Sequence, residues 1–257
     1  NNLNSKDSLS PRRGSNKFVW NTKYEGPEVL DGMIFWSVSF SGAKAPPGKY
    51  NVELRKNGLI KSQSFDILIN PNSEATIEDI QSQVTFVNTI NATVDRAHKA
   101  IKKIRKINSS LIEFEKNYKG SKESINLILK SKKLRNQLIK IEKTLYQTQN
   151  KSNQDPLNFP IKLTNKLGHL NSLVTYNDFP PTNQDEEVRI ELTEKVEKQL
   201  ETYKSFIEND IYNLWYELPA LKRYAEVWRG RIGTLMHMLL THGLYDDRGI
   251  NYVDGSF

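Results

Sequence analysis

The sequence has no cysteine, four histidines among its 257 residues and no long apolar run. The lack of cysteine excludes disulfides and thiolate metal sites. No run reaches the ~18 apolar residues that a membrane-spanning helix needs, so no segment is expected to cross a bilayer. The polar stretch from Asn1 to Asn16 has no apolar core and is predicted to be a linker, not a signal peptide. If the protein is exported, we expect its signal to lie upstream of Asn1.

The formal net charge of +7 is unevenly distributed along the chain. Between Val94 and Lys143 there are 15 Lys/Arg and 5 Asp/Glu, whereas between Asp185 and Glu226 there are 6 Lys/Arg and 11 Asp/Glu. Helices of opposite charge compensate one another when they lie side by side. We favour that interpretation over a basic helical adaptor for nucleic acid or another polyanion.

Residues 17–75 have the pattern of a small β-module. Four aromatic and β-branched segments are predicted as strands: Phe18–Trp20, Met33–Phe40, Tyr50–Leu54 and Phe65–Ile69. Asn57-Gly58 predicts a hairpin, because both central residues of a type I′ turn need positive φ. An immunoglobulin-like sandwich has about seven strands. We therefore predict an immunoglobulin-like antiparallel module that is incomplete at its N-terminus.

From Thr76 the apolar period changes from two to about 3.5, which predicts helices. Thr76 with Asp79, and Thr182 with Asp185, have the spacing of capping boxes. The predicted fold is α+β and mostly α, with an antiparallel helical bundle over 76–211 and a helical tail over 212–257. Two of the helices should form an antiparallel hairpin through these residues: Val84, Val87, Val94 and Ile101 against Leu134, Leu138, Ile141 and Leu145.

A short connector interrupts the helices, and its prolines forbid a continuous helix there. Its members are Asp155, Pro156, Leu157, Asn158, Phe159 and Pro160. We predict a structural corner in which Leu157 and Phe159 are buried against the helices. Asn158 or Asp155 should hydrogen-bond main-chain groups.

No catalytic or metal-ligating residue is predicted, because no nucleotide-binding, hydrolase or metalloprotease motif occurs in a suitable context. His98 and Asn91 lie on a helical seam, where polar residues set register. Four aromatics of the β-module are candidates for ligand or interface contacts, with core packing as the more favoured role: Trp20, Tyr24, Phe35 and Trp36. We also expect Trp20, Phe35, Trp36 or Phe40 to be covered from outside residues 1–75, first of all by the helices.

Two parts of the chain resemble a known family. The β part contributes Phe18–Tyr24, Gly32–Trp36 and Ala45–Leu54, and the helical part contributes Leu145–Asn150, Gln154–Leu163 and Asn165–Leu167. Together they resemble the last β-module and helical extension of bacterial sortilin-like β-propeller proteins with BNR repeats, often labelled glycosyl hydrolases. The likeness runs from Lys17 to Ile211 and weakens beyond Tyr212.

This resemblance implies an exported protein, periplasmic, on the outer surface or secreted. The propeller that would hold any hydrolase activity is not in this sequence, so no catalytic residue carries over and no cofactor is expected. We expect a structural and interaction role, with an upstream propeller or another protein chain as partner. A carbohydrate-binding accessory role, with polysaccharide as partner, is the alternative.

Overall fold

The computed structural model describes residues 13–38, 40–117, 125–211 and 214. It is mostly helical with a small two-stranded antiparallel sheet, as the sequence predicts at that level. Contacts divide the chain into two units. The first holds the described residues up to Lys99 and from Leu145 to Glu197; the second holds those from Ala100 to Thr144 and from Lys198 on. Of the predicted tail 212–257, all but Leu214 lies outside the described residues.

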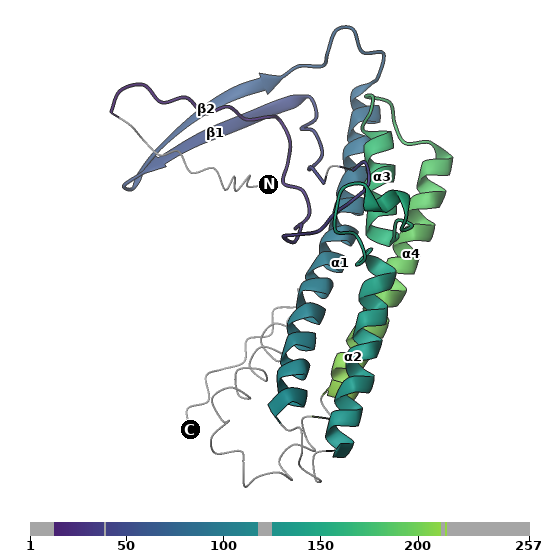
Figure 1. Cartoon of the computed structure of the whole chain (residues 1–257). Coiled ribbons are helices and arrows are strands. Elements are labelled where there is room, and N and C mark those ends of the chain that lie inside the picture. Colours follow the sequence, from purple (N-terminus) through teal and green to yellow (C-terminus); the bar gives the residue numbers. More distant parts are fainter. Residues whose placement is uncertain (1–12, 39, 118–124, 212–213, 215–257) are drawn as a thin grey trace. The chain divides into compact units, whose positions relative to one another are not determined.

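The sheet is a single hairpin of β1 (Gly48–Lys56) and β2 (Leu59–Ile67), shown in Figure 1. Tyr50 pairs with Phe65 and Lys56 pairs with Leu59. Asn57 and Gly58 have φ values of 49° and 81°. Positive φ at both positions is the signature of a type I′ turn, so the predicted hairpin turn is confirmed.

Two of the four predicted strands are absent from the described residues. Residues 33–38 and 40 are irregular, and Ser37 has a φ of 51°, which interrupts an extended strand. Residues 18–20 are not in a strand either, and the described residues before β1 have a single antiparallel bridge, between Lys23 and Lys44. A Cβ at Gly42 would lie 1.9 Å from the carbonyl oxygen of Tyr24. The chain at Gly42 therefore lies directly against the backbone of Tyr24, and a side chain at position 42 would not fit there.

The helices begin and end close to where the sequence places them. They are α1 (Ile77–Asn117), α2 (Ile125–Leu145), α3 (Leu163–Val174) and α4 (Asn183–Phe206), followed by a π-helical turn (Ile207–Ile211). At the start of α1 the Thr76 N–H donates to Asp79 Oδ2 at 2.9 Å, and the Asp79 N–H donates to Thr76 Oγ1 at 3.1 Å. Both predicted capping boxes are present, since Thr182 and Asp185 make the same pair of bonds before α4. None of the described helices is long and apolar enough to span a membrane.

In the first unit, α3 runs antiparallel to the N-terminal part of α1, and α4 runs parallel to the same part of α1. Gln83 donates to the carbonyl of Val174 at 2.9 Å, while Asn171, one turn earlier on α3, donates to Asn91 Oδ1 at 3.3 Å. On the other side, the Arg189 guanidinium lies over the Phe86 ring, and Arg96 pairs with Glu197 further along both helices. The apolar stripe of α1 between these partners is buried: Phe86, Val87, Ile90, Val94 and Ala97.

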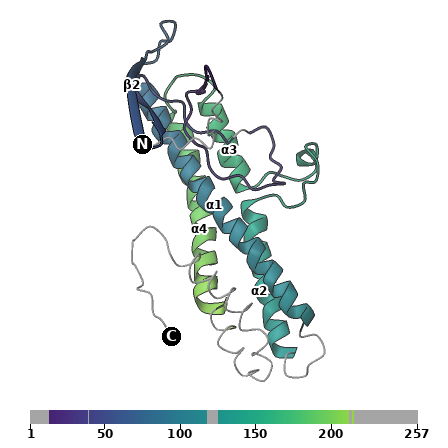
Figure 2. The ribbon, with the colours of Figure 1, turned by 90° about the vertical axis from the view of Figure 1, so that its left-hand side faces the viewer.

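In the second unit, α2 runs antiparallel to the C-terminal part of α1, as Figures 1 and 2 show. Arg105 Nε lies 2.8 Å from Glu142 Oε1, and Arg135 lies 3.1 Å from Glu115 Oε2. These pairs place Leu134 and Leu138 opposite the stretch of α1 that follows Ile104. The antiparallel direction of the predicted hairpin is therefore confirmed.

The predicted register of that hairpin is wrong. Val84, Val87 and Val94 belong to the part of α1 that packs with α3, not with α2. The reason is length, because α1 has 41 residues and α2 has 21, or about 62 Å against about 32 Å. A helix of half the length that turns back from the end of α1 can cover only the second half of it.

Candidate functional site

The irregular residues 33–38 and 40, here called the strap, are held by side chains of α3 and of the stretch that follows α2 in the first unit. The Ile34 N–H donates to Tyr146 Oη at 2.8 Å. The Trp36 N–H donates to Asn165 Oδ1 at 2.7 Å, and Asn165 Nδ2 donates back to the Trp36 carbonyl at 3.1 Å. Asn150 Nδ2 donates to the Ile34 carbonyl at 3.3 Å. Backbone groups that a sheet would pair are thus paired with side chains, which explains why this aromatic segment is no strand.

An aromatic cluster lies under the strap. The Phe35 and Phe40 rings meet edge to face with centroids 4.7 Å apart, and both contact His98, at 5.6 and 5.5 Å. Tyr146 adds a third neighbour of Phe35, at 5.4 Å. The expectation that module aromatics are covered by the helices is therefore confirmed for Phe35 and Phe40.

His98 and Asn91 have the structural role that the seam predicts. His98 is fully buried, and its Nδ1 lies 2.6 Å from the carbonyl oxygen of Glu28. Asn91 Nδ2 donates to the Ser41 carbonyl at 3.1 Å, and its Oδ1 accepts from Asn171. Each residue ties the segment before the hairpin to α1.

Trp20 and Tyr24 belong to a second cluster, at the base of the hairpin. The Trp20 ring lies 6.0 Å from Tyr50 and 6.4 Å from Phe65, and its Nε1 donates to the Lys23 carbonyl. Burial, with a smaller contribution from a hydrogen bond with Tyr24, raises the pKa of Tyr50 to about 12. Phe35 lies in the other cluster, and Trp36 is 37% exposed. The four candidate aromatics are therefore not brought together into one ligand platform.

The connector is an ordered corner that contains a short 3₁₀ helix (Asp155–Leu157). Asp155 accepts hydrogen bonds from the Ser152 N–H at 2.9 Å and from the Lys151 N–H, so the predicted main-chain contacts of Asp155 are confirmed. These bonds hold the pKa of its carboxyl below 3.8. Pro156 lies inside the 3₁₀ turn, and Gln147 donates to the carbonyl of Pro160 at 2.9 Å.

The predicted burial of the connector's apolar side chains is wrong for Leu157, which is 67% exposed. Phe159 is half-buried and Asn158 is exposed. The Asn158 and Phe159 N–H groups both donate to the Asp155 carbonyl. The corner is thus fixed by hydrogen bonds around Asp155, and apolar anchors are not needed.

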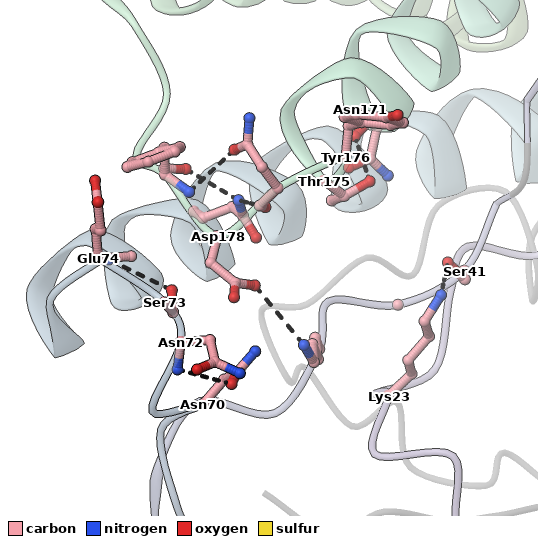
Figure 3. Close-up of a pocket in the computed structure, with 16 residues that line it drawn as sticks. Lys23, Ser41, Asn70, Asn72, Ser73, Glu74, Asn171, Thr175, Tyr176 and Asp178 are labelled. Carbon is pink, nitrogen blue, oxygen red and sulfur yellow. Dashed lines mark hydrogen bonds and ion pairs between the residues drawn. The ribbon is translucent and has the colours of Figure 1, made fainter.

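A cavity of about 510 Å³ opens in the first unit where three loops meet α1 and α3 (Figure 3). Its lining comes from the crossing before β1, the turn before α1 and the loop after α3. The side chains that line it include Lys23, Ser41, Lys44, Asn70, Asn72, Ser73, Glu74, Gln83, Asn171, Thr175, Tyr176, Asn177, Asp178 and Phe179. No motif in the sequence predicts this site. The only signal for it was the density of Asn and Ser in the two turns, which by itself indicates loops.

Among the described residues, the ionisable groups with clearly shifted pKa values lie outside the cavity. No group of three or more His, Asp or Glu side chains that could hold a metal ion occurs among them. Asp79 and Asp155 have lowered pKa values because main-chain N–H groups donate to them, and the pKa of Glu191 is lowered by a hydrogen bond from Lys195. Burial raises the pKa of Tyr203. None of these four groups lines the cavity.

The chain was compared with protein families, curated proteins and solved structures. No family model, no curated protein and no solved structure matches the chain.

Proposed function

We propose that this chain is a non-catalytic structural and interaction part of a larger exported protein, of the kind that carries a sortilin-like propeller. In this proposal the hairpin belongs to an immunoglobulin-like module, and the helices form a bundle that braces it. The observation that carries the proposal is an apolar face of the hairpin that nothing in the described residues covers at its outer end.

The two faces of the hairpin differ in polarity. Tyr50, Val52 and Leu54 alternate along β1, and the register places Phe65 and Leu59 on the same face. Towards the turn this face also carries Gln63, Lys61 and Lys56, which pair with Val52, Leu54 and Leu59. Trp20 covers the base of this face, at Tyr50 and Phe65. Towards the turn the cover ends: Val52 is 54%, Leu54 59% and Leu59 74% exposed.

The opposite face is polar and is satisfied within the hairpin. Ser64 donates to Asn51 Oδ1 at 2.7 Å, and Arg55 pairs with Glu53 at 2.6 Å. A hairpin of two strands is marginally stable in water, and it gains stability when its exposed apolar side chains pack against another element. Strand edges also offer free backbone groups to another strand. We therefore expect the apolar face to dock on a β-sheet of the same exported protein.

The test compares amide hydrogen exchange over residues 48–67 in the natural-length protein, purified with an antibody against this chain, and in the 257-residue chain. Docking should slow exchange across the hairpin of the natural-length protein. Leu59→Ser should remove this protection, because burial of a leucine contributes about 1.5–3 kcal/mol. Ile60→Ser is the matched control, since Ile60 is also exposed but pairs with Arg55 on the polar face.

Equal exchange rates in the two proteins would contradict the proposal. So would an equal loss of protection in the Leu59→Ser and Ile60→Ser variants, because the protection would then not depend on the apolar face.

A further inference from the structure

We infer that the cavity of the first unit is a binding site for a neutral oligosaccharide. Its volume of about 510 Å³ lies within the range of about 300–1,000 Å³ typical of small-ligand sites. Such sites are usually lined by apolar side chains, whereas this one is lined mainly by amides and hydroxyls. The inference concerns a surface separate from the hairpin face and does not depend on the proposed docking.

The charges around the cavity cancel. Two lysines, Lys23 and Lys44, stand against two carboxylates, Glu74 and Asp178. Lys44 Nζ lies 3.7 Å from Asp178 Oδ1, and Lys23 Nζ donates to Ser41 Oγ at 3.3 Å. A site with no net charge has no preference for an anion or a cation. It suits a ligand that both donates and accepts hydrogen bonds, as sugar hydroxyls do.

The loops that line the cavity are fixed before any ligand arrives. Gln83 Nε2 lies 2.8–3.0 Å from the carbonyl oxygens of Val174, Asn177 and Phe179, so one buried amide holds the loop after α3. In the turn before α1, Asn70 Oδ1 accepts from the Asn72 N–H at 3.1 Å. A preorganised site loses little conformational entropy when it binds.

Two aromatic residues of the loop that lines the cavity are open to solvent. Tyr176 is 91% exposed and Phe179 is 51% exposed, although both follow directly on the buried end of α3. Their exposure is not explained by packing within the unit. Aromatic faces beside hydroxyl and amide groups offer the apolar side of a pyranose ring a surface to cover, while its hydroxyls meet the polar lining.

One buried acceptor in the lining has no donor. Asn171 is 3% exposed, and its Oδ1 accepts no hydrogen bond in the part of the chain that the structure describes. Its orientation follows from two hydrogen bonds: Asn91 Nδ2 donates to the Ser41 carbonyl, and Asn91 Oδ1 accepts from Asn171 Nδ2. This oxygen is itself enclosed by the surrounding atoms, so a ligand hydroxyl, a donor of the kind it lacks, reaches it only when a neighbouring side chain moves aside.

The experiment titrates the ¹⁵N-labelled 257-residue chain with maltotriose, cellotriose and chitotriose, and with trialanine as a peptide probe. We expect at least one sugar to shift the resonances of residues 70–75 and 171–179, including the side-chain amide of Asn171, and trialanine to shift none. Affinity should not change between ~0.1 M and ~1 M salt, because screening acts on charged ligands. Tyr176→Ala should weaken binding about two- to ten-fold, the loss that one aromatic contact accounts for.

Tyr176 is so exposed that its replacement does not endanger folding, and Phe18→Ala, at 46% exposure and outside the cavity lining, is the matched control. The control should bind the sugar as the parent chain does. The inference is overturned if no sugar shifts the cavity residues up to millimolar concentration. It is equally overturned if only trialanine binds, if high salt abolishes binding, or if Tyr176→Ala and Phe18→Ala bind alike.

Discussion

Replacing Gly168 on α3 by alanine changes the free energy of unfolding, and the strap decides whether that change is a gain or a loss. A Cβ atom at position 168 would lie 2.6 Å from Cε1 and 2.8 Å from Cζ of Phe40, and 3.4 Å from Cβ of Val38. The Phe40 ring is half-buried and packs against Phe35 and His98, so moving it away from α3 disturbs these contacts. Gly168→Ala should therefore push against the docked strap.

Two effects of opposite sign decide the result. Alanine in place of glycine inside a helix contributes about 1 kcal/mol when the new methyl group meets nothing. Overpacking of a well-packed site costs about 1–3 kcal/mol. Because both contacts with the Phe40 ring are shorter than 3.0 Å, we expect the cost to win. Gly168→Ala should lower the free energy of unfolding by up to ~2 kcal/mol.

The assay is urea unfolding followed by circular dichroism, in two backgrounds. In the Phe40→Ala background the obstructing ring is gone, so Gly168→Ala should there raise stability by about 1 kcal/mol. The sign should thus reverse between the two backgrounds. If Gly168→Ala stabilises the parent chain as much as the Phe40→Ala variant, the strap does not pack on α3 and this description of the first unit fails.

Three further predictions concern single side chains. Asn165→Ala removes both hydrogen bonds to the Trp36 backbone and should cost about 1–3 kcal/mol in urea unfolding; an unchanged stability would contradict the strap contacts. Leu138→Ala should cost about 2–5 kcal/mol because Leu138 is fully buried, while Leu129→Ala, at 59% exposure, should cost far less; similar losses would exclude the α1–α2 packing. NMR titration of the Asp155 carboxyl should give a pKa below 3.8, its ordinary value. The contribution of Asp155 to stability is then complete above pH 3.8 and disappears as the pH falls through the pKa of the folded state. A pKa at or above 3.8 would refute this.

Local signals in the sequence were sufficient wherever neighbouring residues determine the structure. The Asn57-Gly58 turn and both capping boxes are properties of two to four adjacent residues, and all three are present. The seam residues Asn91 and His98 were also assigned correctly, because a polar residue on an apolar stripe needs a partner wherever the helix packs. Helix positions were therefore predictable from the sequence.

The failures concern partners that are distant in the sequence. The segment 33–40 has strand composition, but Asn165 and Tyr146, more than a hundred residues away, take its backbone hydrogen bonds. The register of α2 depended on where α1 ends, which the apolar stripe alone does not specify. The cavity is assembled from three loops, and each of them alone has only the composition of a turn.

The most direct test of the proposed role is the size and location of the natural protein in its own cells. An antibody against the helices would be used to probe cytoplasmic, envelope and culture-medium fractions on one blot. The proposal predicts a band well above the 29.7 kDa of this chain, found in the envelope or the medium. A band at 29.7 kDa confined to the cytoplasm would contradict it.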